Sequence, residues 1–114
     1  MIRNNNQLTV VITVERDATG PPAAHLSYHP AVLLAHRGDC IKWKCENGPF
    51  VLQFLRGTPL GHVYIHSNGC NGNYETDCIP VPPGAPNGRH PYAVAVCSER
   101  IVHIDAGCPE IIID

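Results

Sequence analysis

Apolar and polar residues alternate in several short segments of the chain, and this two-residue period is the feature that most constrains the fold. Residues 8–14 place every second side chain, all of them Leu, Val or Ile, on one side of an extended strand. Residues 40–45 follow the same rule, with Trp43 on the apolar side and Lys42 and Lys44 on the other. Apolar residues nowhere recur at helical spacing over three turns. The sequence therefore predicts an all-β chain.

Further segments rich in β-branched and aromatic residues extend this prediction. They cover 30–36, 50–55, 62–66, 91–96, 100–105 and 110–114. Seven to eight short strands in 114 residues predict a single β-sandwich domain over 1–114. Between Ser67 and Arg89 the chain is rich in Gly, Pro and Asn, which predicts one long irregular loop. Long loops in compact domains are often functional, so this loop is the first place to look for a binding role.

The charge distribution argues against two classes of partner. Ten acidic and eight basic residues give a net charge of −2, and no block of like charge concentrates a field. Nucleic acid is therefore not an expected partner. No segment approaches the roughly 18 apolar residues of a membrane span, so no membrane span is predicted.

Location is predicted in two ways that disagree. The first residues lack the apolar core and cleavage site of a signal peptide, which predicts a cytoplasmic protein. Six cysteines in so small a domain are typical of an oxidising compartment. A native leader removed from the chain would reconcile the two and make the protein a secreted one.

Several motifs follow one another in a recognisable order. The segment PAVLL (30–34) precedes GDCIKW (38–43) and GPFVLQF (48–54), and YAVAV (92–96) and PEII (109–112) complete the order. This order resembles the cupredoxin-like superfamily over roughly 30–56 and 91–114. The resemblance implies a Greek-key β-sandwich and does not by itself imply an activity.

The same resemblance implies where a copper ion would bind. Cupredoxins hold copper with two His, one Cys and a weak axial Met. The position matching the first His is Phe50 or an apolar neighbour, and the position matching the Cys is Val96. Cys97 lies one residue further on, which turns a strand side chain to the opposite face, and Met1 is the only methionine. We expect a divergent member without the type 1 copper ligands and with no cofactor.

A metal site built from other residues is the alternative. Copper or zinc could be bound by Cys97, His103 and Cys108, with His62 or His66 as a further ligand. Two histidines four residues apart lie about 13 Å apart along a strand, which is too far to chelate one ion unaided. The spacing therefore favours surface histidines.

The cysteine spacing contains no Cys-x-x-Cys and leaves the connectivity open. Cys70 and Cys78 bracket a Gly- and Asn-rich segment, where a disulfide would contribute about 2 to 3 kcal/mol. A second disulfide between Cys97 and Cys108 could close the last hairpin. In a reducing compartment both pairs would instead be redox-sensitive thiols.

Two further cysteines lie in one predicted strand. Cys40 and Cys45 point to opposite faces of residues 40–45, so they are not expected to pair with each other. Cys45 shares the apolar side with Trp43 and is predicted to be a small buried residue.

No complete catalytic set is evident in the sequence. Cys97, His90, His103 and Asp105 lie near one another in the sequence, but no Gly-x-Ser-x-Gly nucleophile elbow is present. We therefore predict no enzymatic activity and no catalytic residue.

These observations predict a non-catalytic binding or assembly module that acts through protein–protein contacts. A protein partner or further copies of the chain would contact residues 67–90 and exposed sheet edges. The alternative is a metal-binding or thiol redox protein that uses the cysteines and histidine near the C-terminal hairpin.

Overall fold

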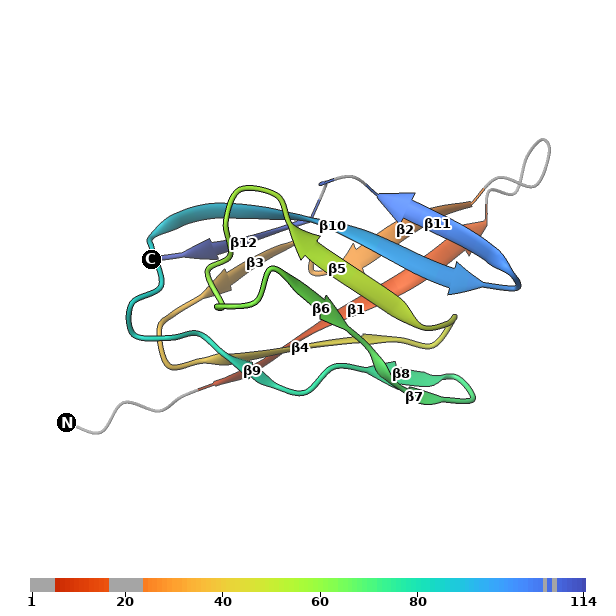
Figure 1. The fold of residues 1–114 in the computed structure, drawn as a ribbon, viewed down its shortest axis with the longest axis horizontal. Helices are drawn as coiled ribbons and strands as arrows, with labels where there is room; N and C mark the ends of the chain where they lie inside the picture. Colours follow the sequence, from red (N-terminus) through yellow and green to blue (C-terminus); the bar gives the residue numbers. More distant parts are fainter. Residues whose placement is uncertain (1–5, 17–23, 106, 108) are drawn as a thin grey trace.

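The computed structural model describes residues 6–16, 24–105, 107 and 109–114, and these residues fold into twelve strands (Figure 1). Their bounds are β1 (Gln7–Arg16), β2 (Ala24–His29), β3 (Val32–Ala35), β4 (Cys40–Cys45), β5 (Phe50–Phe54), β6 (Tyr64–His66), β7 (Asn68–Cys70), β8 (Asn73–Glu75), β9 (Ile79–Pro80), β10 (Gly88–Ser98), β11 (Ile101–Asp105) and β12 (Glu110–Ile113). None of the described residues forms a helix long and apolar enough to cross a membrane.

The strands form two six-stranded sheets. The β1 sheet has the order β2-β1-β4-β8-β7, with β9 also paired to β4. The β10 sheet has the order β3-β12-β10-β5-β6, with β11 also paired to β10, and β10 runs along most of the molecule in Figure 1. Two pairs are parallel, β1 with β4 and β3 with β12, and the others are antiparallel. The all-β prediction is confirmed.

The chain passes from one sheet to the other between β2 and β3. Only Pro30 and Ala31 separate these strands, yet β2 pairs with β1 and β3 pairs with β12. The sequence predicts one strand over 30–36 and misses β2, because its outward residues are His and Ser and only Leu26 and Tyr28 point inward.

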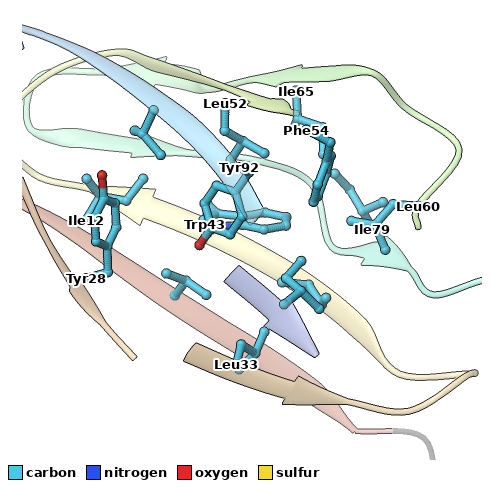
Figure 2. Close-up of a cluster of buried hydrophobic side chains, with 14 of the residues drawn as sticks. Ile12, Tyr28, Leu33, Trp43, Leu52, Phe54, Leu60, Ile65, Ile79 and Tyr92 are labelled. Carbon is cyan, nitrogen blue, oxygen red and sulfur yellow. The ribbon is translucent and has the colours of Figure 1, made fainter. Parts of the chain in front are cut away.

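The core lies between the two sheets and contains the apolar sides of the predicted strands other than 100–105, whose apolar side chains are exposed (Figure 2). Trp43 of β4 and Tyr92 of β10 come from opposite sheets, and both are fully buried. The Trp43 Nε1–H donates a hydrogen bond of 3.1 Å to the Tyr92 hydroxyl, and the two rings meet edge to face with centroids 5.8 Å apart. Phe54 packs against the same tyrosine at 5.7 Å. The predicted position of Trp43 on the apolar side of 40–45 is confirmed.

Residues 67–90 are more ordered than the sequence predicts, which corrects the expectation of one long irregular loop. They contain β7, β8 and β9, which extend the β1 sheet beside β4. The Thr76 N–H donates to the Trp43 carbonyl at 2.9 Å, and Val81 and Ala85 are buried in the core. Strands of two or three residues are too short for alternation to be recognised in a sequence.

The Gly38-Asp39 turn closes the end of the sandwich ahead of β4. Gly38 adopts a φ of 94°, which favours glycine, and Asp39 is only 2% exposed. The Asp39 carboxylate accepts hydrogen bonds from the N–H groups of Asn6 at 3.1 Å and His36 at 2.9 Å. These bonds explain why a carboxylate is stable in this buried turn.

Candidate functional site

The two positions that the resemblance assigns to copper ligands lie in the core. Phe50 and Val96 are directly opposite each other in the β5–β10 ladder, with 4% and 0% of their surfaces exposed. Neither side chain carries an atom that can donate to a metal. Their environment is apolar packing between the sheets.

Cys97 and His103, two of the alternative metal ligands, do not point toward one another. Cys97 lies opposite Val102 and faces outward, whereas His103 lies opposite the buried Val96, on the other face of the β10–β11 hairpin. Cys108 lies outside the described residues, and so does the predicted Cys97–Cys108 disulfide. Within the described part of the chain, no group of three His, Cys, Asp or Glu side chains is placed to hold a metal ion.

The residues considered for nucleophilic catalysis are also dispersed. His90 lies seven residues before Cys97 on β10, a separation of about 23 Å along a strand. The His90 ring contacts the Pro86 carbonyl oxygen through Nε2 at 2.9 Å. Asp105 and His103 share the inward side of β11, away from the Cys97 thiol. The structure does not bring a nucleophile, a base and an orienting group together from these four residues.

The disulfide joins Cys78 to Cys40, with Cα atoms 5.4 Å apart, and this corrects the predicted pairing of Cys78 with Cys70. Cys70 instead lies opposite Asn73 in the β7–β8 hairpin, where its thiol is free and exposed. The pairing of β9 with β4 sets Cys40 opposite Pro80 and so brings Cys78 to it. The two-residue strand β9 gives no signal from which this pairing could be predicted.

The remaining described cysteine, Cys45, behaves as predicted. Only 2% of its surface is exposed, and burial raises the pKa of its thiol, opposed in part by the backbone N–H groups of Asn47 and Gly48. The thiol is therefore held in its protonated, unreactive form.

A hollow of about 350 Å³ with a mixed polar and apolar lining opens between β6 and residues 76–80. His62 and His66 both line it, together with Asp77 and Asn68, and Ile65 and Ile79 form its apolar part. Both histidines are exposed, as the sequence predicts. The hollow places hydrogen-bonding side chains beside the Cys40–Cys78 disulfide, which lies at its edge.

A larger continuous feature covers the outer face of the β10 sheet, where β6, β5, β10 and β11 lie side by side. Cross-strand neighbours form one row of Ile104, Ala95, Val51 and His66 and a second row of Ala93, Gln53 and Tyr64. Val102 lies beside Ile104, two residues along β11. We define the apolar face as these residues without Gln53 and His66: Val51, Tyr64, Ala93, Ala95, Val102 and Ile104.

The apolar face is not flat. Ala93 and Ala95 on the central strand β10 form a low floor, because their side chains are the smallest on the face. Ile104 and Val102 on one side are 72% and 59% exposed, and Tyr64 on the other side is 65% exposed. Two adjoining shallow depressions of about 330 and 340 Å³ follow this floor, and Cys97 lies in the second. Together they form a groove along β10 with an aliphatic ridge on β11.

No Asp, Glu, Lys or Arg side chain lines either depression in the part of the chain that the structure describes. Contiguous exposed apolar patches are rare on monomeric soluble proteins and often mark interaction surfaces. Sequence reasoning pointed to residues 67–90 and to sheet edges and missed this face. One signal was present, because residues 101–104 place apolar side chains on both sides of the strand, unlike 40–45 with its two lysines.

No protein-family model matches this sequence, and a comparison with curated proteins found no match.

Proposed function

We propose that this protein is a non-catalytic binding or assembly module with a cupredoxin-like Greek-key fold, and that it acts through protein–protein contacts. The observation that carries the proposal is the apolar face. Its solvent-exposed aliphatic and aromatic side chains contribute nothing to the core, and their exposure to water is unfavourable unless another surface covers them.

The strand connections support the Greek-key assignment. Successive strands repeatedly lie in different sheets, as β2 and β3, β4 and β5, and β9 and β10 do. Such crossings are typical of Greek-key sandwiches. The type 1 copper positions occupied by Phe50 and Val96 support a member of this fold without blue copper.

The Cys40–Cys78 disulfide supports a location in an oxidising compartment. It favours the secreted alternative over the cytoplasmic one, since cytosolic thiols are kept reduced.

Site-specific photo-crosslinking in cells of the source organism tests the proposal. A photoreactive residue at Gln53, in the middle of the apolar face, is expected to give a discrete protein adduct. The matched control is the same residue at Lys44, which is exposed on the outer face of the β1 sheet. The adduct should disappear when Ile104→Arg is added. Equal labelling from both positions, or labelling insensitive to Ile104→Arg, would falsify the proposal.

A further inference from the structure

We infer that the partner of the apolar face is a second copy of this chain. In the symmetric dimer, Val102 and Ile104 of each copy pack into the groove above Ala93 and Ala95 of the other. This inference rests on the proposed function and names its partner.

The first argument is shape. The ridge on β11 and the groove along β10 are neighbours on one surface, because Ile104 lies directly opposite Ala95 in the ladder. A surface that carries a projection beside a matching depression is complementary to itself after a two-fold rotation. Dimers with two-fold symmetry use the same patch on both subunits, so that each contact occurs twice.

The second argument is charge. The depressions are lined by apolar side chains with only Gln53, His66, Ser67 and the Tyr64 hydroxyl as polar groups beside the Cys97 thiol. A charged partner would lose hydration on this face without gaining a counter-charge. A second copy presents the same surface, so no Asp, Glu, Lys or Arg side chain of either depression is desolvated.

The third argument is extent. Tyr64, Val102 and Ile104 each expose more than half of their surface, and Val51 exposes 37%. With the alanines between them, the face is on the order of several hundred Å² per copy, below the roughly 800 Å² per partner of a standard interface and in the range of weak, reversible association. Two such faces would stack as sheets do in a sandwich, about 10 Å apart.

Sedimentation velocity of the purified full chain tests the dimer. We expect a reversible monomer–dimer equilibrium in the micromolar range. Ile104→Glu should raise the dissociation constant at least 100-fold. Thr9→Glu, at an exposed strand position of the β1 sheet, is the matched control and should change the constant less than twofold. Circular dichroism and thermal unfolding of each variant verify that it is folded.

A monomer at all concentrations up to about 1 mM would overturn the second copy as partner. If the Gln53 crosslinker still captures a different protein in an Ile104-dependent manner, the proposed function stands while this inference fails. If it captures nothing specific, both fail.

Complementation tests the reciprocal geometry. Ala95→Arg in the groove and Ile104→Glu on the ridge should each give monomers. An equimolar mixture should regain a heterodimer, because the Glu at 104 of one copy then lies on the Arg at 95 of the other. A wild-type dimer whose two variants are monomeric and do not recombine would contradict the ridge-in-groove packing.

Discussion

The outer faces of the two sheets differ in chemistry. On the β1 sheet, Lys42 pairs with Glu75 at 3.1 Å, and Glu15 accepts a hydrogen bond from Ser27 at 3.0 Å. Val11, 36% exposed, is the one large hydrophobic residue that this face exposes to that extent among those described. On the β10 sheet the outward positions of β5, β6, β10 and β11 are mainly Ala, Val, Ile and Tyr, with Gln53 and His66 among them, and Arg89 pairs with Glu110 at 3.4 Å toward β12.

The inner faces of the two sheets are equally apolar, so folding accounts for both of them. A sandwich needs one buried, apolar face on each sheet. Its outer faces are usually polar, and a large apolar outer face is favourable only when another surface covers it. The polar outer face is what folding alone requires. The apolar outer face is the one that the proposed dimer would cover.

The largest expected effect concerns the Cys40–Cys78 disulfide. Its Cys40 lies in β4 of the β1 sheet. Replacing Cys40 and Cys78 together with Ala should lower the free energy of unfolding by about 4 kcal/mol, because the bond closes a long loop in the unfolded chain. Urea unfolding measures the change. Cys70→Ala removes an exposed free thiol and should cost less than about 0.5 kcal/mol.

The double replacement of Cys40 and Cys78 also tests whether the outer faces of the two sheets are independent of each other. Dimerisation through the β10 sheet should persist in the folded variant, because the disulfide lies on the other sheet. Loss of the dimer from a protein that is still folded would show that the two outer faces are not independent.

The next effect concerns the contact that the inner faces share. Burial raises the pKa of Tyr92 to about 12, although the Trp43 hydrogen bond opposes the shift. Unfolded tyrosine ionises near pH 10, so between pH 10 and 12 the folded state holds a proton that the unfolded state has lost. The free energy of unfolding should therefore fall by about 1.4 kcal/mol per pH unit across that window through this residue.

Tyr92→Phe provides the control for the alkaline titration. It removes the ionisable group, so the extra fall between pH 10 and 12 should vanish. At neutral pH it should cost about 1 to 3 kcal/mol, because the buried Trp43 Nε1–H loses its acceptor. An unchanged alkaline slope in this variant would assign the effect to other groups.

A smaller effect separates the two hairpins. The β7–β8 hairpin of the polar sheet turns through Asn71 and Gly72 with φ of 55° and 83°, which suits these residues. The β10–β11 hairpin turns through Glu99 and Arg100 with φ of 53° and 65°, which does not. Replacing Glu99 with Asn and Arg100 with Gly should raise the free energy of unfolding by about 0.5 to 1 kcal/mol.

Thermal unfolding of the turn variant, at a protein concentration below the dissociation constant of the dimer, measures this gain. The matched control makes the opposite replacement in the β7–β8 hairpin. There, Asn71→Glu together with Gly72→Arg should destabilise the protein. A loss of stability in the first variant would show that Glu99 and Arg100 stabilise the hairpin through contacts of their side chains.

The smallest effect is expected at the outer faces themselves. In the monomer, Ile104→Thr on the apolar face and Lys42→Ala on the polar face should each change the free energy of unfolding by about 0.5 kcal/mol or less. Urea unfolding at low protein concentration checks both. A loss above about 2 kcal/mol for Ile104→Thr would mean that the apolar side chain belongs to the fold and not to a partner.

The core could be predicted because it depends on local alternation. Trp43 in 40–45, Leu52 in 50–55 and Val94 in 91–96 all lie inward as the period requires. The outer apolar face could not be predicted in the same way, because it depends on which strands are neighbours. Ala93 and Ala95 become the floor of a groove only once β10 lies between β5 and β11.

The disulfide illustrates the same limit. Cys70 and Cys78 are close in the sequence, but the hairpin directs Cys70 to Asn73 and the β4–β9 pairing directs Cys78 to Cys40. Strand pairing of two or three residues is determined by tertiary packing and leaves no periodic trace. Sequence proximity was therefore a poor guide to connectivity.

The parallel pairing of β3 with β12 has a kinetic consequence. Leu33 lies beside Ile111 although most of the chain separates them, so this contact carries a large loop-closure entropy and forms slowly. Until β12 docks, both edges of β3 are unpaired, and the nascent sandwich is prone to aggregation. Refolding yield should therefore depend on protein concentration more steeply than the stability of the finished fold does.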